Sequence, residues 1–244
     1  MARVEVIAIE GLPEVRPGDD LAALLAARAS FASGDVLAVV HKVVSKAEGR
    51  VVALADVEPS PRAIELAEPW GKDPRHVEVV LRESAELLRA ERGLLICRTR
   101  HGFVCANAGV DASNSGGPGE FVLLPLDPDA SARRLRAALP GRPAVVITDS
   151  FGRAWRHGQL DTAIGIAGLA PLEDWRGRPD AAGRTMRGSW IAVADGVAAA
   201  ADLVRRKDGG VPAAIIRGLG RHVTAEDGAG AVALLRPVDE DLFA

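Results

Sequence analysis

A short apolar run that turns polar within one residue constrains this chain more than any other feature. Residues 145–147 (Val-Val-Ile) are typical of the end of a buried strand, and residues 148–159 then supply carboxylate, hydroxyl, amide, glycine and basic side chains. Binding sites in α/β proteins often form where strands deliver polar groups at their carboxyl ends. Asp149 and Ser150 carry the hard oxygen atoms that divalent metals prefer. The other interpretation is a strand end followed by a glycine-containing turn with solvated arginines, and the run alone leaves both open.

Length and composition bound the fold and exclude several classes of function. The chain has 244 residues, of which 48% are hydrophobic and 26% charged, an ordinary balance for a globular protein. The net charge of −3 gives no electrostatic case for nucleic-acid binding, and no apolar run approaches the roughly 20 residues of a membrane span. Cys97 and Cys105 are too few for a disulfide framework, so we expect core thiols. We therefore expect a cytoplasmic protein without nucleic-acid or membrane partners.

Strand-like and helix-like patterns alternate along the chain. Apolar alternation and short apolar runs predict strands over 4–9, 36–44, 94–98, 103–106, 121–124, 144–147 and 213–216. Helical spacing predicts helices over 21–32, 62–68, 73–89, 129–139 and 191–204, with caps at Asp19 or Asp20 for the first and at Asp129 or Ser131 for the fourth. Residues 174–187 read as a polar loop. Because no linker interrupts this alternation, we predict one domain over residues 1–244, of the α/β to α+β class.

Three polar clusters each follow a predicted strand, and they converge if the strands are neighbours. Their members are His41, Lys42, Ser45, Lys46 and Glu48, then Asn107, Asp111, Ser113 and Asn114, then residues 149–159. Lys46 and Arg153 are suited to neutralising phosphate oxygens. Asp111, Asp149 and Ser150 fit Mg²⁺ or Mn²⁺ better than zinc, because these ions prefer oxygen ligands to nitrogen and sulfur.

Each of these groups also has a purely structural interpretation. Lys46 and Glu48 read equally well as a solvated strand exit, and Asp111 as a side chain that satisfies its own loop backbone. His41 and His157 are as consistent with structural roles as with reactive ones. The sequence contains neither a Gly-x-x-x-x-Gly-Lys-Ser/Thr loop nor a Gly-x-Ser-x-Gly elbow, so we expect any nucleotide to bind outside a P-loop and no serine triad.

Taken together, a series of short motifs resembles the F420-0:gamma-glutamyl ligase family. The motifs are residues 11–13 with 17–19, 43–50, 107–114, 148–153, 161–165, and 210–212 with 217–218. They occur in order over nearly the whole chain, which makes coincidence a poor explanation. The resemblance implies a mixed-sheet fold and an intertwined homodimer.

The resemblance also implies an activity, which is the GTP-dependent addition of L-glutamate to the carboxylate of coenzyme F420-0 through an acyl phosphate, with release of GDP and phosphate. It implies Mg²⁺ or Mn²⁺, as two ions, between acidic ligands and the nucleotide phosphates. The metal ligands would be Asp111, Asp149 and Ser150. The nucleotide contacts would be Leu12, Pro13, His41, Lys42, Lys46, Asn114, Lys207 and Asp208. Lys46, Asp149 and Arg153 would act in catalysis, with Arg153 and Arg156 as candidate anchors for substrate carboxylates.

Two positions depart from the family pattern. Residues 205–207 are Arg-Arg-Lys where members often have Met-Gly-Lys, and Gly196 stands where a glutamate is expected. Arg206 thus replaces a glycine that would let backbone approach a phosphate or base. A glutamate ligase acting on a folate or pterin, a non-catalytic nucleotide-binding homologue and a metal-dependent phosphohydrolase are the alternative functions. Because the sequence ends at Ala244, we expect it to lack the C-terminal flavin-binding domain of some relatives.

Overall fold

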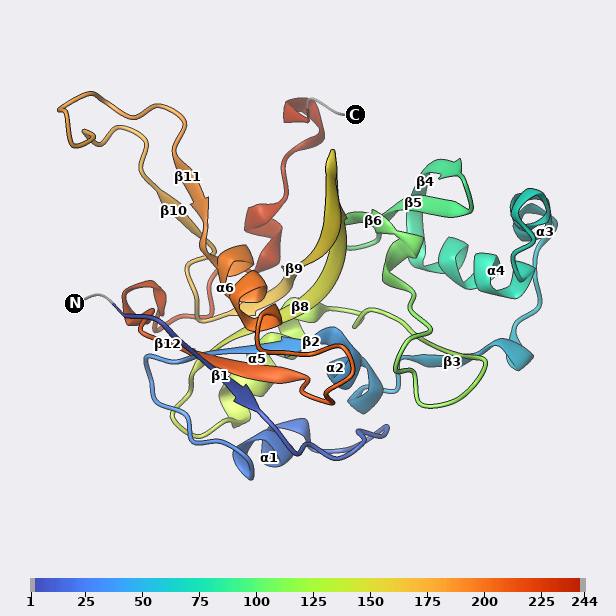
Figure 1. The fold of residues 1–244 in the computed structure, drawn as a ribbon, viewed down its shortest axis with the longest axis horizontal. Helices are drawn as coiled ribbons and strands as arrows, with labels where there is room; N and C mark the ends of the chain where they lie inside the picture. Colours follow the sequence, from blue (N-terminus) through green and yellow to red (C-terminus); the bar gives the residue numbers. More distant parts are fainter. Residues whose placement is uncertain (1–2, 242–244) are drawn as a thin grey trace.

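The computed structural model describes residues 3–241, and a mixed sheet forms its centre (Figure 1). Within these residues the main sheet has five strands, in the order β1 (Glu5–Ile9), β12 (Ala213–Arg217), β2 (Val36–Val40), β8 (Ala144–Arg153) and β9 (Arg156–Ala167). Strands β2 and β8 are parallel, whereas the other neighbours are antiparallel. The predicted mixed α/β class is confirmed.

Helices cover both faces of the two central strands. Residues 36–39 of β2 and 144–147 of β8 are completely buried, which requires cover on both faces of the sheet. Helix α6 (Val193–Asp202) contacts β9, β12 and β8, while α5 (Pro128–Ala138) packs against β9 and β8 and is itself contacted by α1 (Leu21–Ala26). The long apolar runs of the sequence are therefore the middle layer of the molecule.

Helix α5 approaches β9 closely because of a glycine. A Cβ on Gly165 would lie 2.5 Å from the carbonyl oxygen of Pro128, so any larger residue would push the first turn of α5 away. The prediction that Asp129 or Ser131 caps this helix is wrong, because Asp127 accepts the capping hydrogen bond. Asp129 instead accepts from the backbone N–H groups of Ile166 in β9 and of Ala231, the first residue of a later 3-10 helix, which ties α5 to the sheet. Asp20 caps α1, as predicted.

A smaller lobe, on the right of Figure 1, has a second hydrophobic cluster. It contains β3 (Val51–Ala53), α3 (Pro61–Ala67), α4 (Pro74–Glu83), β4 (Ser84–Glu91), β5 (Leu94–Thr99), β6 (Val104–Ala106) and β7 (Glu120–Val122). The predicted hairpin of β5 and β6 is confirmed, and Cys97 and Cys105 face each other in it as buried free thiols. Short 3-10 helices lie at Leu54–Asp56, Glu68–Trp70, Asn107–Gly109, Gly220–His222, Ala231–Leu234 and Val238–Glu240. The assignment of residues 1–244 to one domain stays a prediction.

Two predicted elements change type part-way along. The helix predicted over 73–89 ends at Glu83, since residues 84–91 pair with β5 as β4. The strand predicted over 36–44 ends at Val40, and His41–Ala47 form helix α2. Both errors arise where tertiary pairing or packing overrides local preference. The helix predicted over 21–32 also ends early, at Ala26.

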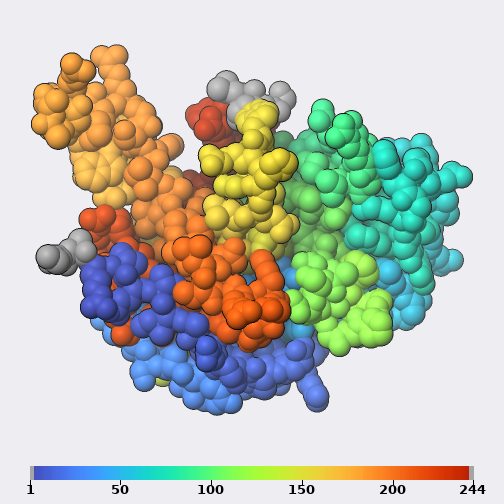
Figure 2. Space-filling view, viewed as in Figure 1, coloured from blue at the N-terminus to red at the C-terminus, as the bar shows by residue number. Residues whose placement is uncertain are grey.

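A long hairpin projects from the body at the upper left of Figures 1 and 2. It begins at β10 (Leu172–Asp174), returns at β11 (Trp190–Ala192), and contains the predicted polar loop. The guanidinium of Arg176 lies 3.9 Å from the ring centroid of Trp190, which is 51% exposed. Within residues 3–241, no helix combines the length and the apolar character needed to cross a bilayer.

Candidate active site

A pocket of ≈ 540 Å³ lies where the parallel pairing of β2 with β8 ends, at Val40 and Thr148. Since these strands are parallel, the residues that follow their paired segments lie at one edge of that pairing and share a cavity. Loop 111–119 (light green) and loop 203–212 (orange) lie side by side in the space-filling view, and both contribute to the pocket wall (Figure 2). The predicted site residues in the lining are Leu12, Pro13, His41, Lys42, Lys46, Asp111, Asn114, Asp149, Ser150 and Lys207.

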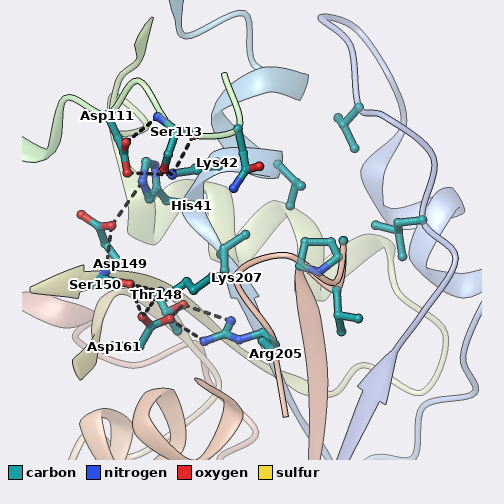
Figure 3. Close-up of a pocket in the computed structure, with 18 of the residues that line it drawn as sticks. His41, Lys42, Asp111, Ser113, Thr148, Asp149, Ser150, Asp161, Arg205 and Lys207 are labelled. Carbon is teal, nitrogen blue, oxygen red and sulfur yellow. Dashed lines mark hydrogen bonds and ion pairs between the residues drawn. The ribbon is translucent and has the colours of Figure 1, made fainter. Parts of the chain in front are cut away.

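The polar run after residue 147 is not a loop, because β8 continues to Arg153 and pairs with β9. A β-bulge between Ile147 and Thr148 shifts the register, so that Ser150 stands opposite Asp161. Bulges change the direction of the side chains beyond them. Successive strand residues point to opposite faces. Asp149 and Ser150 therefore reach different parts of the pocket (Figure 3).

Asp111 and Lys42 form one charged group of the pocket. Lys42 Nζ lies 2.7 Å from Asp111 Oδ2 and donates to the Ser113 hydroxyl at 2.6 Å. The backbone N–H of Ser113 donates to Asp111 Oδ1. Burial favours a higher pKa for Asp111, but these hydrogen bonds outweigh burial and lower its pKa below the usual range. Asp111 thus satisfies its own loop and also presents an ionised carboxylate to the pocket.

His41, the residue before Lys42, contacts Asp149. His41 is only 1% exposed, its Nδ1 lies 3.3 Å from Ser45 Oγ, and its Nε2 lies 3.3 Å from Asp149 Oδ1. The second contact has ion-pair distance without hydrogen-bond geometry, so within the described residues Nε2 is a buried polar atom lacking a hydrogen-bond partner.

Burial, with a contribution from the Asp149 charge, raises the pKa of Cys105 to about 12. That thiol is a core residue, as predicted.

Ser150 belongs to a second group, on the opposite side of β8 (Figure 3). The Ser150 hydroxyl donates to Asp161 Oδ1 at 2.5 Å and accepts from Lys207 Nζ at 2.7 Å. Asp161 is 1% exposed and also accepts from Arg205 Nη2 and from the Thr148 hydroxyl. Asp161 stands in one of the motifs that carry the family resemblance, but the sequence alone gives it no role. Its pairing with Ser150 follows from the strand register, which the sequence does not reveal.

Lys46 is neither solvated nor on a strand exit. It lies in the last turn of α2, is 7% exposed, and forms an ion pair with Glu14 on the loop that follows β1. Loop 12–15 and the first turn of α2 therefore form one wall of the pocket. Because the ammonium is buried beside the cavity, it is placed to interact with an anion that enters.

Three predicted residues, Arg153, Arg156 and Asp208, do not reach the pocket lining. Arg153 lies near the tip of the β8–β9 hairpin, where it donates to the carbonyl oxygens of His157 and Gly158. Asp208 is exposed and forms an ion pair with Arg206 at 3.4 Å. Gly196 lies in α6, and a Cβ there would meet no atom within 4 Å, so the departure leaves no packing defect.

Comparison with known proteins identifies the family. The F420-0:Gamma-glutamyl ligase family matches residues 11–218. The chain belongs to this family. It is 43% identical to the coenzyme F420:L-glutamate ligase of Methanothermobacter thermautotrophicus, over 98% of both chains. The corresponding ligase of Methanopyrus kandleri is 46% identical, over 99% of this chain and 97% of its own, and that of Archaeoglobus fulgidus is 46% identical, over 89% and 88%.

The donor atoms of the pocket suit the divalent ion implied by the family resemblance. Among residues 3–241, no three histidine, cysteine or acidic side chains form a complete metal centre. The carboxylates of Asp111 and Asp149 and the hydroxyl of Ser150 are oxygen donors, which Mg²⁺ and Mn²⁺ prefer; Mg²⁺ commonly completes its shell with water and substrate phosphates. Lys42 and Lys207 ammonium groups contact two of these donors. A cation is therefore already favoured at each of two positions.

Proposed function

We propose that this chain is a ligase that adds L-glutamate to coenzyme F420-0, with GTP as the phosphoryl donor. Family membership and the curated names of relatives that match nearly the whole chain support the reaction type. The observation that carries the proposal is the convergence of acidic and basic groups in one pocket, where the parallel pairing of β2 with β8 ends. Such a pocket suits a polyphosphate with its metal.

The chemistry explains why both charges are needed. A carboxylate does not react with an amine unaided, because its carbonyl carbon is a poor electrophile. In the proposed reaction, a carboxylate oxygen of F420-0 attacks the γ-phosphorus of GTP and GDP leaves. The glutamate nitrogen then attacks the acyl carbon, loses a proton, and displaces phosphate. The buried Lys46 ammonium, with Lys42 and Lys207, neutralises charge on the transferring phosphoryl group.

We assign Asp111 and Asp149 to one divalent ion and Ser150 to a second. Asp149 and Ser150 are successive residues of β8 and point to opposite sides of it, which supports two metal positions rather than one. When bound, the ions would draw electron density from the phosphate oxygens. Lys42 and His41 hold the first pair of carboxylates in place. Leu12, Pro13 and Asn114 line the same pocket and are proposed as nucleotide contacts.

We also infer a homodimer. The β10–β11 hairpin extends away from the body, and Trp190 and Ile191 on it are each 51% exposed. Exposed apolar side chains on a projecting hairpin are typical of a surface that a second copy covers. Light scattering on the purified protein should give twice the mass of the chain.

Mass spectrometry of the acceptor tests the proposed reaction. F420-0 is incubated with the protein, GTP, Mn²⁺ and L-glutamate, and parallel samples omit one component or replace GTP with ATP. We expect added glutamyl mass only in complete mixtures, with GTP supporting more product than ATP. GTP hydrolysis without glutamyl product would contradict the proposal and favour a phosphohydrolase, and glutamylation of a pterin but not of F420-0 would change the acceptor.

A further inference from the structure

Asp161 and Arg205 form a buried ion pair in the wall of the pocket. Arg205 Nη2 lies 2.5 Å from Asp161 Oδ2, and the two side chains are 3% and 2% exposed. Arg205 Nη1 also donates to the Thr148 hydroxyl at 3.1 Å, and that hydroxyl donates to Asp161 Oδ2 at 2.9 Å. The three side chains thus close a ring of hydrogen bonds (Figure 3). The ring fixes the Asp161 carboxylate from one side.

The other oxygen of Asp161 determines what the Ser150 hydroxyl can do. A serine hydroxyl has one hydrogen to donate and lone pairs with which to accept. The hydrogen of Ser150 is directed to Asp161 Oδ1 at 2.5 Å, so its lone pairs are directed elsewhere. Lys207 Nζ, a cation, lies 2.7 Å from the same oxygen. Asp161 therefore turns Ser150 into an acceptor for positive charge.

We propose that Asp161 and Arg205 are positioning residues that hold the Ser150 oxygen toward a divalent cation. This inference rests on the proposed metal-nucleotide function of the pocket. Asp161 does not act as a ligand itself, because the carboxylate is buried and three side chains already donate to it. Arg205 is the residue that differs from the methionine of the family pattern. Its guanidinium pairs with the Asp161 carboxylate at a depth where a lone charge would be costly.

Two roles of the pair must be separated by experiment, because a buried ion pair also affects stability. Removing only one partner leaves a buried charge and destabilises the fold. Neutralising both, in Asp161→Asn with Arg205→Met, removes the unpaired charge while nearly preserving volume. The conservative Arg205→Lys retains the positive charge. A matched control, Arg62→Met with Glu65→Gln, neutralises an exposed ion pair on α3 that lies outside the pocket lining.

The decisive readout is Mn²⁺ binding, which is measured by electron paramagnetic resonance with Mn²⁺ alone and with Mn²⁺ plus GTP. Unfolding in urea is measured in parallel. We expect the double neutral variant to unfold close to the parent protein but to bind Mn²⁺ at least about 10-fold more weakly, as when groups behind a metal ligand are changed. Arg205→Lys should keep most of the parent protein's affinity for Mn²⁺. The α3 control should bind Mn²⁺ like the parent.

Parent-like Mn²⁺ affinity in the double neutral variant would overturn the inference, because the pair would then serve stability alone. Absence of Mn²⁺ binding to the parent protein would overturn it as well. Failure of the proposed function is recorded separately, as missing glutamyl product with the parent protein. A parent that binds Mn²⁺ and forms no product would therefore refute the ligase proposal while leaving the positioning claim to the Mn²⁺ titrations.

Discussion

Asp149 allows the metal role and the structural role of one carboxylate to be measured apart. Its side chain is 13% exposed, and it is the charged neighbour of the buried ring of His41, with 3.3 Å between Asp149 Oδ1 and His41 Nε2. Asp149→Ala removes the carboxylate beside that ring nitrogen, which has no hydrogen-bond partner among the described residues, and the loss of this close polar contact costs about 1–3 kcal/mol. For a chain of this size, each kcal/mol lowers the melting temperature by about 2–4 °C. We therefore expect Asp149→Ala to melt about 2–12 °C below the parent.

Asp149→Asn separates the two effects. The amide keeps the volume and a polar neighbour for His41, so its stability should lie within about 1 kcal/mol of the parent. It removes the negative charge that attracts a divalent ion, so turnover should fall about 100-fold or more, as when one electrostatic contact to a reacting group is lost. Calorimetry and glutamyl-product formation at saturating Mn²⁺ give the two numbers. Parent-like turnover of Asp149→Asn would refute the metal role, and a stable Asp149→Ala would refute the account of His41.

Four other substitutions have defined outcomes. Lys46→Met keeps the buried stem but loses the ammonium, so product formation should slow about 100-fold with little change in melting temperature; unchanged turnover would contradict its role. Arg217, which donates to Asp35, holds the pKa of that carboxyl below 3.8, so this stabilisation is present above that value and is lost as pH falls through the folded pKa. The free energy of unfolding, measured in urea, should therefore fall less steeply between about pH 6 and pH 3 in Asp35→Asn than in the parent. Gly165→Ala should destabilise the fold by about 1–3 kcal/mol through overpacking against α5. Gly196→Ala, in open space on α6, should stabilise it by about 0.5–1 kcal/mol. Equal changes in the free energy of unfolding, measured in urea, would contradict the described packing of α5.

The apolar patterns of the chain predicted the main strands, and members of all three polar clusters line one pocket. Residues 36–39 of β2 and 144–147 of β8 are buried, and the polar residues after them converge because these strands are parallel neighbours. The motif resemblance placed Asp111 in the same pocket although it follows a strand of the smaller lobe. Family membership, inferred from those motifs, is confirmed.

The errors have physical causes that the sequence does not display. His41 begins a helix because the chain leaves the sheet at Val40, while its apolar neighbours resemble a continuing strand. Asp161 stayed without a role because the β-bulge sets its register against Ser150. The polar run up to Arg153 was open to interpretation as a turn, because its partner strand lies later in the chain. Pairing across a sheet decided each of the last two cases.

The central claim is that this pocket transfers phosphate from a nucleotide to an acceptor carboxylate. The most direct measurement uses F420-0 labelled with oxygen-18 in the carboxylate that receives glutamate, with GTP, Mn²⁺ and L-glutamate. If an acyl phosphate forms, one labelled oxygen appears in the released phosphate for each amide bond, because the displaced oxygen leaves with phosphorus. Unlabelled phosphate alongside glutamyl product, or label recovered in GMP, would contradict the account.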